Sequence, residues 1–229
     1  RDPEMSRGLG DVYKRQIRKC VARGKYVITA TQMLESMTSS PRPTRAEISD
    51  VANAVYDGTS AVMLSGESAA GKYPVESVKA LDAICFEAEQ NGEFTALKDY
   101  IEHHSIQDSN PIRGSICRAA RDIAHQIGAR AIIVESATGK VARAMTHFRP
   151  NVPIIAVVTS SLVCKKLCLN WGITALIGEE KKTSDAITKQ AMEKALSTGY
   201  FKKGDIVVVI SSNRTAPTSS TDSLNVRIL

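Results

Sequence analysis

The first half of the chain alternates between short apolar stretches and segments with helical periodicity. The stretches Tyr26–Ala30 and Ala61–Leu64 have the length and composition of buried strands. The segment between them carries an apolar stripe at the spacing of a buried helical face, made of Ile48, Val51, Ala52 and Val55. A second stripe follows, made of Val75, Val78, Leu81, Ile84 and Cys85. This half is therefore predicted to be β-α-β-α.

Local signals place the ends of these helices. Ile17–Arg23 has the pattern of a helix tail, and Gly24 follows it as a stop signal. Thr44 and Glu47 have the spacing of a capping box at the start of the next helix. Pro74 is typical of the first position of the helix after it.

The second half repeats the alternation with more strands. Predicted strands are Ala131–Val134, Ile154–Val158, Thr174–Ile177 and Ile206–Ile210. Predicted helices are a stripe through Ile116, Ala120, Ile123 and Ile127, and the segments Ser160–Asn170 and Ser184–Thr198. Fully apolar strands separated by helices indicate a mostly parallel sheet covered on both faces. After the loop Ser211–Ser223, Leu224–Leu229 is predicted to add an edge strand.

The predicted organisation has four parts. Residues 1–16 show no usable period, so we interpret them as an atypical, non-native segment and exclude them from the fold; a divergent native terminus is the alternative. Residues 17–89 form the first α/β region and residues 90–110 a polar linker. Residues 111–229 form a separate α/β domain.

Composition and charge argue against several functional classes. The net charge of +6 comes from Lys and Arg scattered among acids, with few aromatics, which argues against nucleic-acid binding. No apolar run is long enough to span a membrane. Five dispersed cysteines favour a reducing, cytoplasmic setting. Cys164 and Cys168 lie one helical turn apart, as a metal site would need, but no matching pair is nearby, so core packing is predicted.

Three stretches of sequence resemble the pyruvate kinase family. They read ATQMLESM from Ala30, PRPTRAEISDVANAV from Pro41 and MLSGESAAGKYPVESV from Met63. The resemblance continues more loosely, so that it runs from Ile17 to Leu229. It implies the last two β/α units of a (β/α)8 barrel, followed by a regulatory α/β domain with a mostly parallel sheet.

The resemblance also implies a reaction. Pyruvate kinases transfer a phosphoryl group from phosphoenolpyruvate to ADP, giving pyruvate and ATP, with Mg²⁺ and commonly K⁺. By resemblance, the family's metal-binding carboxylates, catalytic lysine and K⁺ ligands have no counterpart in this chain, so no metal site is predicted here and the chain alone is predicted to be inactive. The alternatives are a noncatalytic phosphometabolite-binding or assembly module, and an incomplete gene product without a role of its own.

Three residues at strand ends are the predicted catalytic group. By resemblance, Thr31 lines the pyruvate site and helps to position or protonate the enolate; a cap for the helix after it is the alternative. By resemblance, Ser65 joins a proton-relay network near the substrate. Glu67 is a partner in that network, or else a member of a buried salt bridge.

A second candidate site follows a strand in the second half. Ser136, Thr138, Gly139 and Lys140 place hydroxyls, a glycine and a cation at a helix start, which suits an anion. The resemblance implies a regulatory sugar phosphate there, often fructose 1,6-bisphosphate. Ala137 and Val141 depart from the polar residues common in the family, and the loop Ser211–Ser223 lacks its glycines, which leaves a simple helix start as the alternative.

The resemblance finally implies an assembly. Family members are commonly homotetramers, and the charged segment after Pro41 contributes to contacts between their barrels. Arg42 and Arg45 are therefore predicted to form interface ion pairs. A solvated loop that carries the charges of a helix start is the alternative.

Overall fold

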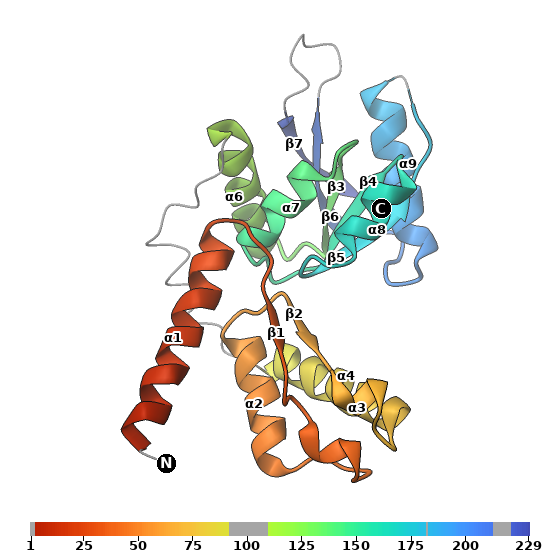
Figure 1. Cartoon of the computed structure of the whole chain (residues 1–229). Helices are drawn as coiled ribbons and strands as arrows, with labels where there is room; N and C mark the ends of the chain where they lie inside the picture. Colours follow the sequence, from red (N-terminus) through yellow and green to blue (C-terminus); the bar gives the residue numbers. More distant parts are fainter. Residues whose placement is uncertain (1–2, 92–109, 182, 213–220) are drawn as a thin grey trace. The chain divides into compact units, whose positions relative to one another are not determined.

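The computed structural model describes residues 3–91, 110–181, 183–212 and 221–229 (Figure 1). The chain divides into two compact units, Arg1–Ser105 and Ile106–Leu229. The predicted linker at 90–110 falls almost wholly outside the described residues, as does most of the predicted loop Ser211–Ser223. No helix in the described ranges is long and apolar enough to cross a membrane.

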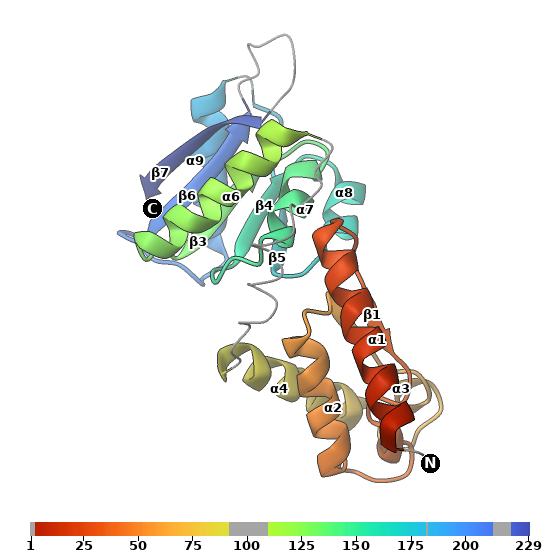
Figure 2. The same ribbon diagram turned by 90° about the vertical axis from the view of Figure 1, so that its left-hand side faces the viewer.

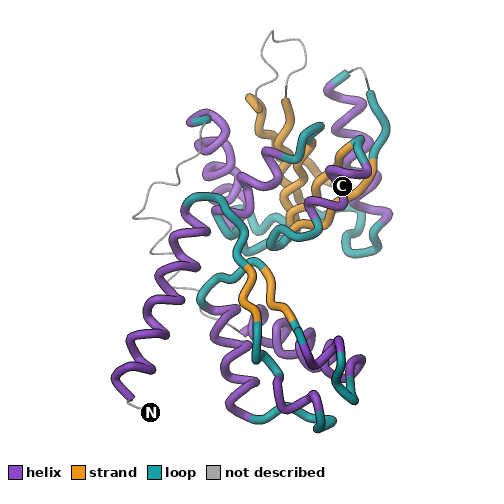
Figure 3. Tube along the Cα trace, in the orientation of Figure 1, coloured by secondary structure: helices purple, strands orange, loops and turns teal. Residues whose placement is uncertain are grey.

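The first unit contains two short strands surrounded by helices. Its elements are α1 (Pro3–Ala22), β1 (Ile28–Ala30), the 3-10 helix η1 (Glu35–Thr38), α2 (Arg45–Tyr56), β2 (Ala61–Met63), α3 (Gly66–Ala69) and α4 (Pro74–Asn91). β1 and β2 pair in parallel, with Ile28 opposite Ala61 and Ala30 opposite Met63 (Figure 3). The predicted β-α-β-α order is confirmed, but the first strand is shorter than Tyr26–Ala30 and the second ends before Leu64.

The helix at the start of the chain was not predicted at its full length. Residues 1–16 were interpreted as lacking a period, yet α1 runs continuously from Pro3 to Ala22. Among the side chains of α1 that the structure describes, from Val12 onward, Ile17 and Val21 are buried. Met5, Leu9 and Val12 have the spacing of one helical face, so the signal was present in the sequence and was overlooked when the segment was interpreted as non-native.

A small core holds this unit together. Met33, Leu34, Met37, Val51 and Ala54 form a buried cluster, and side chains from β2 and α4 pack against it. Burial at Val51 and Val55 confirms part of the predicted stripe, but Ile48 is 40 % exposed. The second stripe was also wrong at its start, because Val75 and Val78 are 57 % and 53 % exposed, while Leu81, Ile84 and Cys85 do pack on the core.

Two predicted helix signals are confirmed at atomic detail. The Thr44 side chain accepts a hydrogen bond from the Glu47 amide, and the Glu47 carboxylate accepts one from the Thr44 amide, which completes the capping box. Gly24 ends α1 with φ at 66°, a conformation that side chains disfavour.

The second unit is a five-stranded sheet with helices on both faces. Its elements are α6 (Pro111–Gln126), β3 (Ala131–Glu135), α7 (Lys140–His147), β4 (Ile154–Val158), α8 (Ser161–Leu167), β5 (Ile173–Ile177), α9 (Ser184–Ser197), β6 (Ile206–Ser212) and β7 (Thr221–Ile228). The strand order is β5-β4-β3-β6-β7, with every pair parallel except β6 and β7. The predicted mostly parallel sheet and its added edge strand are confirmed.

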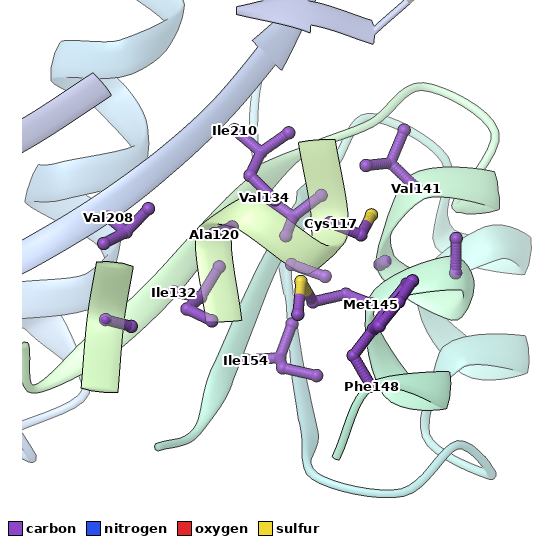
Figure 4. Close-up of a cluster of buried hydrophobic side chains, with 14 of the residues drawn as sticks. Cys117, Ala120, Ile132, Val134, Val141, Met145, Phe148, Ile154, Val208 and Ile210 are labelled. Atoms are coloured by element: carbon purple, nitrogen blue, oxygen red, sulfur yellow. The ribbon is translucent and has the colours of Figure 1, made fainter. Parts of the chain in front are cut away.

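The two faces of this sheet bury separate clusters. Residues from α6, α7 and α8 pack on one face around Ile132, Val134 and Ile154 (Figure 4). The other face, with Ile133 and Ile155, is covered by α9 (Figure 2). Successive strand residues point to opposite faces, so a fully apolar strand buries both of its sides.

The two neighbouring cysteines do not both belong to the core. Cys164, on α8, is half-buried and packs against the cluster on that face. Cys168 is exposed, so core packing was a wrong prediction for this residue. α8 ends at Leu167, and Cys168 is already the residue that caps its carboxyl end.

Candidate functional site

The candidate catalytic residues lie where β1 and β2 end. Because the two strands are parallel, their carboxyl ends meet at one edge of the small sheet. Thr31 follows β1 directly, and Ser65 comes two residues after β2. The structure thus brings the two predicted loops to the same edge, as strand pairing requires.

Thr31 has an unusual backbone conformation. Its φ is 71°, and that of Gln32 is 54°, so both residues lie in the left-handed region. A β-branched residue is rarely found there, because its side chain crowds the carbonyl oxygen. The Thr31 hydroxyl is exposed and donates a hydrogen bond to the Ala30 carbonyl at 2.6 Å. It caps no helix, since the residue before η1 is Leu34, which makes no side-chain cap.

Glu67 joins the two loops. Its side chain is fully buried, and its two carboxylate oxygens accept hydrogen bonds from the Leu34 amide at 3.0 Å and the Ser65 amide at 2.8 Å. In the described part of the chain, no Lys or Arg lies in salt-bridge range of it. The predicted alternative of a buried salt bridge is therefore replaced by a carboxylate that binds backbone amides.

The charge on Glu67 is stabilised by these amides. Burial by itself raises the pKa of the Glu67 carboxyl, and the nearby Glu47 charge adds to that effect. Hydrogen bonds from backbone amides outweigh both, so that the net pKa is lowered. Glu67 is thus ionised at neutral pH, and it acts as an acceptor that fixes the loop after β1 to the loop after β2.

A second carboxylate, that of Glu47, binds the segment that follows Thr31. Glu47 accepts hydrogen bonds from the Ser36 amide at 2.7 Å and the Ser36 hydroxyl at 2.6 Å, in addition to those from Thr44. Burial raises the pKa of Glu47, but the bonds from Ser36 and Thr44 lower it from 4.5 to about 2. The capping box was visible in the sequence; the link to Ser36 was not, because it joins residues that the helix spacing does not relate.

Close backbone contact completes the arrangement. The Lys72 amide donates to the Thr38 carbonyl at 2.9 Å, which joins the segment after α3 to the end of η1. A Cβ atom at Gly71 would lie 2.5 Å from the Glu67 carbonyl oxygen and 3.1 Å from the Thr38 Cα. Only glycine fits here without a backbone shift, so Gly71 is part of what positions Glu67.

The remaining predicted residues of this unit are on the surface. Arg42 and Arg45 are exposed, and the structure contains a single chain, so the predicted interface stays a prediction. Among the described residues, no group of three or more His, Cys, Asp or Glu side chains could hold a metal ion. At the strand ends, the described groups are the Thr31 hydroxyl and the Glu67 carboxylate, which accepts hydrogen bonds from backbone amides.

The second candidate site is the turn between β3 and α7. Gly139 has φ at 72°, and a Cβ atom there would lie 3.0 Å from the Val163 side chain and 3.2 Å from that of Leu167. Glycine thus allows the turn to pack closely against α8. The exposed side chains of Thr138 and Lys140 flank it, and Ser136 is half-buried, with its amide bonded to the Val157 carbonyl.

This turn has the features of an anion site. α7 starts at Lys140, and Gly139 before it has no side chain that could cap the first amides of the helix. Such amides and a nearby ammonium group attract phosphate. All four residues selected from the sequence lie in or beside this turn, and their role in binding an effector stays a prediction.

Comparison with known proteins gives matches in both units. The family model described as "Pyruvate kinase, barrel domain" matches residues 8–78. The model described as "Pyruvate kinase, alpha/beta domain" matches residues 114–227. The first match begins inside the segment that was interpreted as atypical.

Individual relatives agree with these matches. The chain is similar to a pyruvate kinase of Clostridium acetobutylicum, with 42 % identity over 95 % of this chain and 46 % of the relative. It is similar to one of Bacillus licheniformis, with 43 % identity over 86 % of this chain and 33 % of the relative. A solved pyruvate kinase from Cryptosporidium parvum superposes with a TM-score of 0.85 and 32 % identity, over 94 % of this chain and 42 % of that one. The chain spans less than half the length of these relatives.

Proposed function

Because the chain belongs to the pyruvate kinase family, we propose that it is part of an enzyme that transfers a phosphoryl group from phosphoenolpyruvate to ADP. Its first unit supplies the end of the barrel at which the enolate is handled. Its second unit is the regulatory domain. The proposed setting is a cytoplasmic homotetramer, with Arg42 and Arg45 at the contact between barrels.

One observation supports this most: the left-handed backbone at Thr31. Strained conformations persist where the surrounding structure enforces them, and they cluster at functional sites. Here Glu67 binds the Leu34 amide and Glu47 binds Ser36, so the segment after Thr31 is fixed at two points. The exposed Thr31 hydroxyl is thereby held at the end of β1, where it positions a proton for the enolate.

Mg²⁺ and K⁺ belong to the reaction as the family performs it, and they would neutralise phosphoryl charge. The described residues do not fit such an ion, because they contain no cluster of three or more metal-binding side chains. The carboxylates of Glu47 and Glu67 are occupied by amides and hydroxyls. The residues of this chain are therefore assigned no step at a metal.

A chimera tests the role of Thr31. The chain would be joined to the preceding barrel segment of the Clostridium acetobutylicum relative, and pyruvate formation followed in a coupled assay. We expect Thr31→Ala to lower kcat by roughly 10²-fold with little change in KM, since a proton-transfer contribution is lost in the chemical step. Thr38→Ala is the matched control, because its exposed hydroxyl donates to the Glu35 carbonyl within the same loop.

An unchanged kcat in Thr31→Ala, with an active parent chimera, would assign Thr31 a local structural role. Equal losses in the Thr31 and Thr38 variants would point to general damage to the loop. An inactive parent chimera would remove the support for a catalytic barrel end in this chain.

Glu47 should make the same chimera sensitive to acid. The pKa of Glu47 is about 2 in the folded unit, against a reference value of 4.5. Its contribution to the free energy of unfolding is therefore complete above pH 4.5 and is lost as the pH falls toward 2. Because Glu47 is partly solvated, we expect a discounted loss of about 1 kcal/mol in unfolding free energy. Urea unfolding at several pH values measures it. The Glu47→Gln variant should lack this loss of stability at low pH. Identical pH profiles for the variant and the parent would contradict the prediction.

For the second unit we propose sugar-phosphate binding at the turn from Ser136 to Lys140. We expect Lys140→Glu to weaken binding of fructose 1,6-bisphosphate by roughly 100-fold or more, because a charge-assisted bond becomes a repulsion. Calorimetry on the full chain measures the affinity, and Lys189→Glu on the exposed side of α9 is the control for net charge. Equal affinity in both variants would remove this turn from the site.

The same measurement addresses the alternative function, a noncatalytic phosphometabolite-binding module. That function is favoured if the full chain binds the sugar phosphate through Lys140 while the chimera forms no pyruvate. The left-handed Gly139 and its close packing on α8 support a rigid turn suited to either role.

A further inference from the structure

The two strands of the first unit leave one face of their sheet open. Ile28 is paired with Ala61, and paired residues in a sheet lie on the same face. Ala30 and Met63, two residues further along each strand, lie on that face as well. Val62 points to the other face and packs on the core cluster of the unit. Ile28 is 44 % exposed and Met63 is 43 % exposed, so the face opposite the core is both apolar and open.

The backbone of this strand pair is also open at its outer edges. In a parallel pair, successive residues direct their amide and carbonyl groups alternately toward the partner strand and away from it. The Ala61 amide donates to the Val27 carbonyl at 3.3 Å, so Ala61 bonds inward. The register then directs the backbone groups of Ile28 and Val62 to the outer edges. Among the described residues neither edge has a further strand, so a partner could add main-chain hydrogen bonds there (Figure 3).

Helix α4 carries a third exposed feature, an apolar stripe made of Val75, Val78 and Phe86. Val75 and Phe86 are eleven residues apart, which is about three helical turns, so they lie on the same side of the helix. Leu81 and Ile84 of the same helix pack on the core cluster instead. The unit therefore exposes apolar surface on a helix as well as on its sheet.

Further parallel strands with their own helices fit all three features. A lone helix on the open face would cover Ile28 and Met63 but leave both edges unpaired. A single added strand would pair with one edge and leave the face open. Additional β/α units can pair at both edges, curve over the apolar face and supply a helix beside α4, as in a closed barrel. The relatives contain such material, because more than half of the length of the Clostridium acetobutylicum relative has no counterpart in this chain.

We propose that the open sheet face, its two edges and the α4 stripe form a docking surface for a separate polypeptide made of parallel β/α units. The inference rests on the proposed function, because this partner is the remaining part of the catalytic barrel. The pieces bind without a covalent link, through strand pairing at the edges and burial of the apolar face. Parallel strands end at one rim, so docking places Thr31 and Ser65 beside the strand ends of the partner.

Coexpression with the remaining barrel segment of the Clostridium acetobutylicum relative tests this surface. That segment would carry an affinity tag, and we expect it to retain this chain in equimolar amount and to be soluble only when the chain is present. Ile28→Asp and Met63→Asp each place a charge on the face to be buried, so each should lower the amount of retained chain by at least about tenfold. Ile177→Asp is the matched control, because Ile177 is an exposed apolar strand residue of the second unit.

Hydrogen exchange on the purified complex gives a second measurement. The amides of Ile28 and Val62 should exchange on the order of 10²-fold more slowly in the complex than in the free chain, while that of Val208 in the second unit should not change. Ile28 and Met63 are exposed in the free chain, so their variants should keep the helix content of the parent by circular dichroism.

Several outcomes would overturn the proposal. One is a segment that stays insoluble beside the chain, or that is recovered without it. Another is a loss of retained chain in Ile177→Asp as large as in the two β-strand variants. Sedimentation that shows oligomers of this chain alone, in the presence of soluble segment, would assign the open face to a second copy. A stable equimolar complex that forms no pyruvate would support the docking surface and contradict the proposed catalytic function.

Discussion

The purified 229-residue chain is expected to form no measurable pyruvate from phosphoenolpyruvate and ADP, even with Mg²⁺ and K⁺ present. Phosphoryl transfer brings two anions together and requires cations at the transferred group. The described residues contain no cluster that could hold a metal. Glu47 and Glu67, the carboxylates near the strand ends, already accept bonds from amides and hydroxyls.

The expected deficit is large. Loss of a single positive charge at a transferred phosphoryl group costs on the order of 10³- to 10⁵-fold in related chemistry. A coupled assay should therefore place the chain at least about 10⁴-fold below the chimera with the upstream barrel segment. Purified pyruvate kinase of a relative serves as the positive control. Turnover within tenfold of that enzyme would show that this chain contains a complete phosphoryl-transfer site.

The architecture was largely readable from the sequence because its signals are local and repeated. Fully apolar strands such as Ile154–Val158 separate amphipathic helices, and this alternation leaves few topologies open. Hydrophobic periodicity did not predict burial correctly where burial depends on contacts from elsewhere in the fold. Val75 and Val78 have helical spacing yet are exposed, since periodicity shows that a stripe exists without showing how far its packing extends.

The sequence predicted at which strand ends the candidate residues lie, but not which atoms they contact. Resemblance selected Thr31, Ser65 and Glu67, and the parallel pairing of β1 with β2 explains why they meet at one edge. Nothing in the spacing indicated that Glu67 would bind the Leu34 amide, 33 residues away. The left-handed backbone at Thr31 is equally hidden, because a β-branched residue is the last choice for that conformation. Long-range contacts impose both features.

The two units differ in how fully their strands are paired. β1 and β2 have three residues each and pair only with one another among the described residues, so each leaves one edge without a strand partner there. Two-stranded sheets of this kind have marginal stability in water. The second unit has five strands and buries clusters on both faces of its sheet. The residues of both clusters come from the second unit itself.

Native-state hydrogen exchange should therefore separate the chain into two zones. We expect amides of the second unit, such as Ile133 and Val208, to exchange on the order of 10³-fold more slowly than Ile28 and Val62. Exposed apolar side chains near β1 and β2, including Ile28 and Met63, should instead favour association. A dilution series distinguishes the two effects, because protection that arises from association disappears as the protein is diluted. Strong protection at Ile28 and Val62 in a monomer, independent of concentration, would show that the two strands and their helices are stable without further strands.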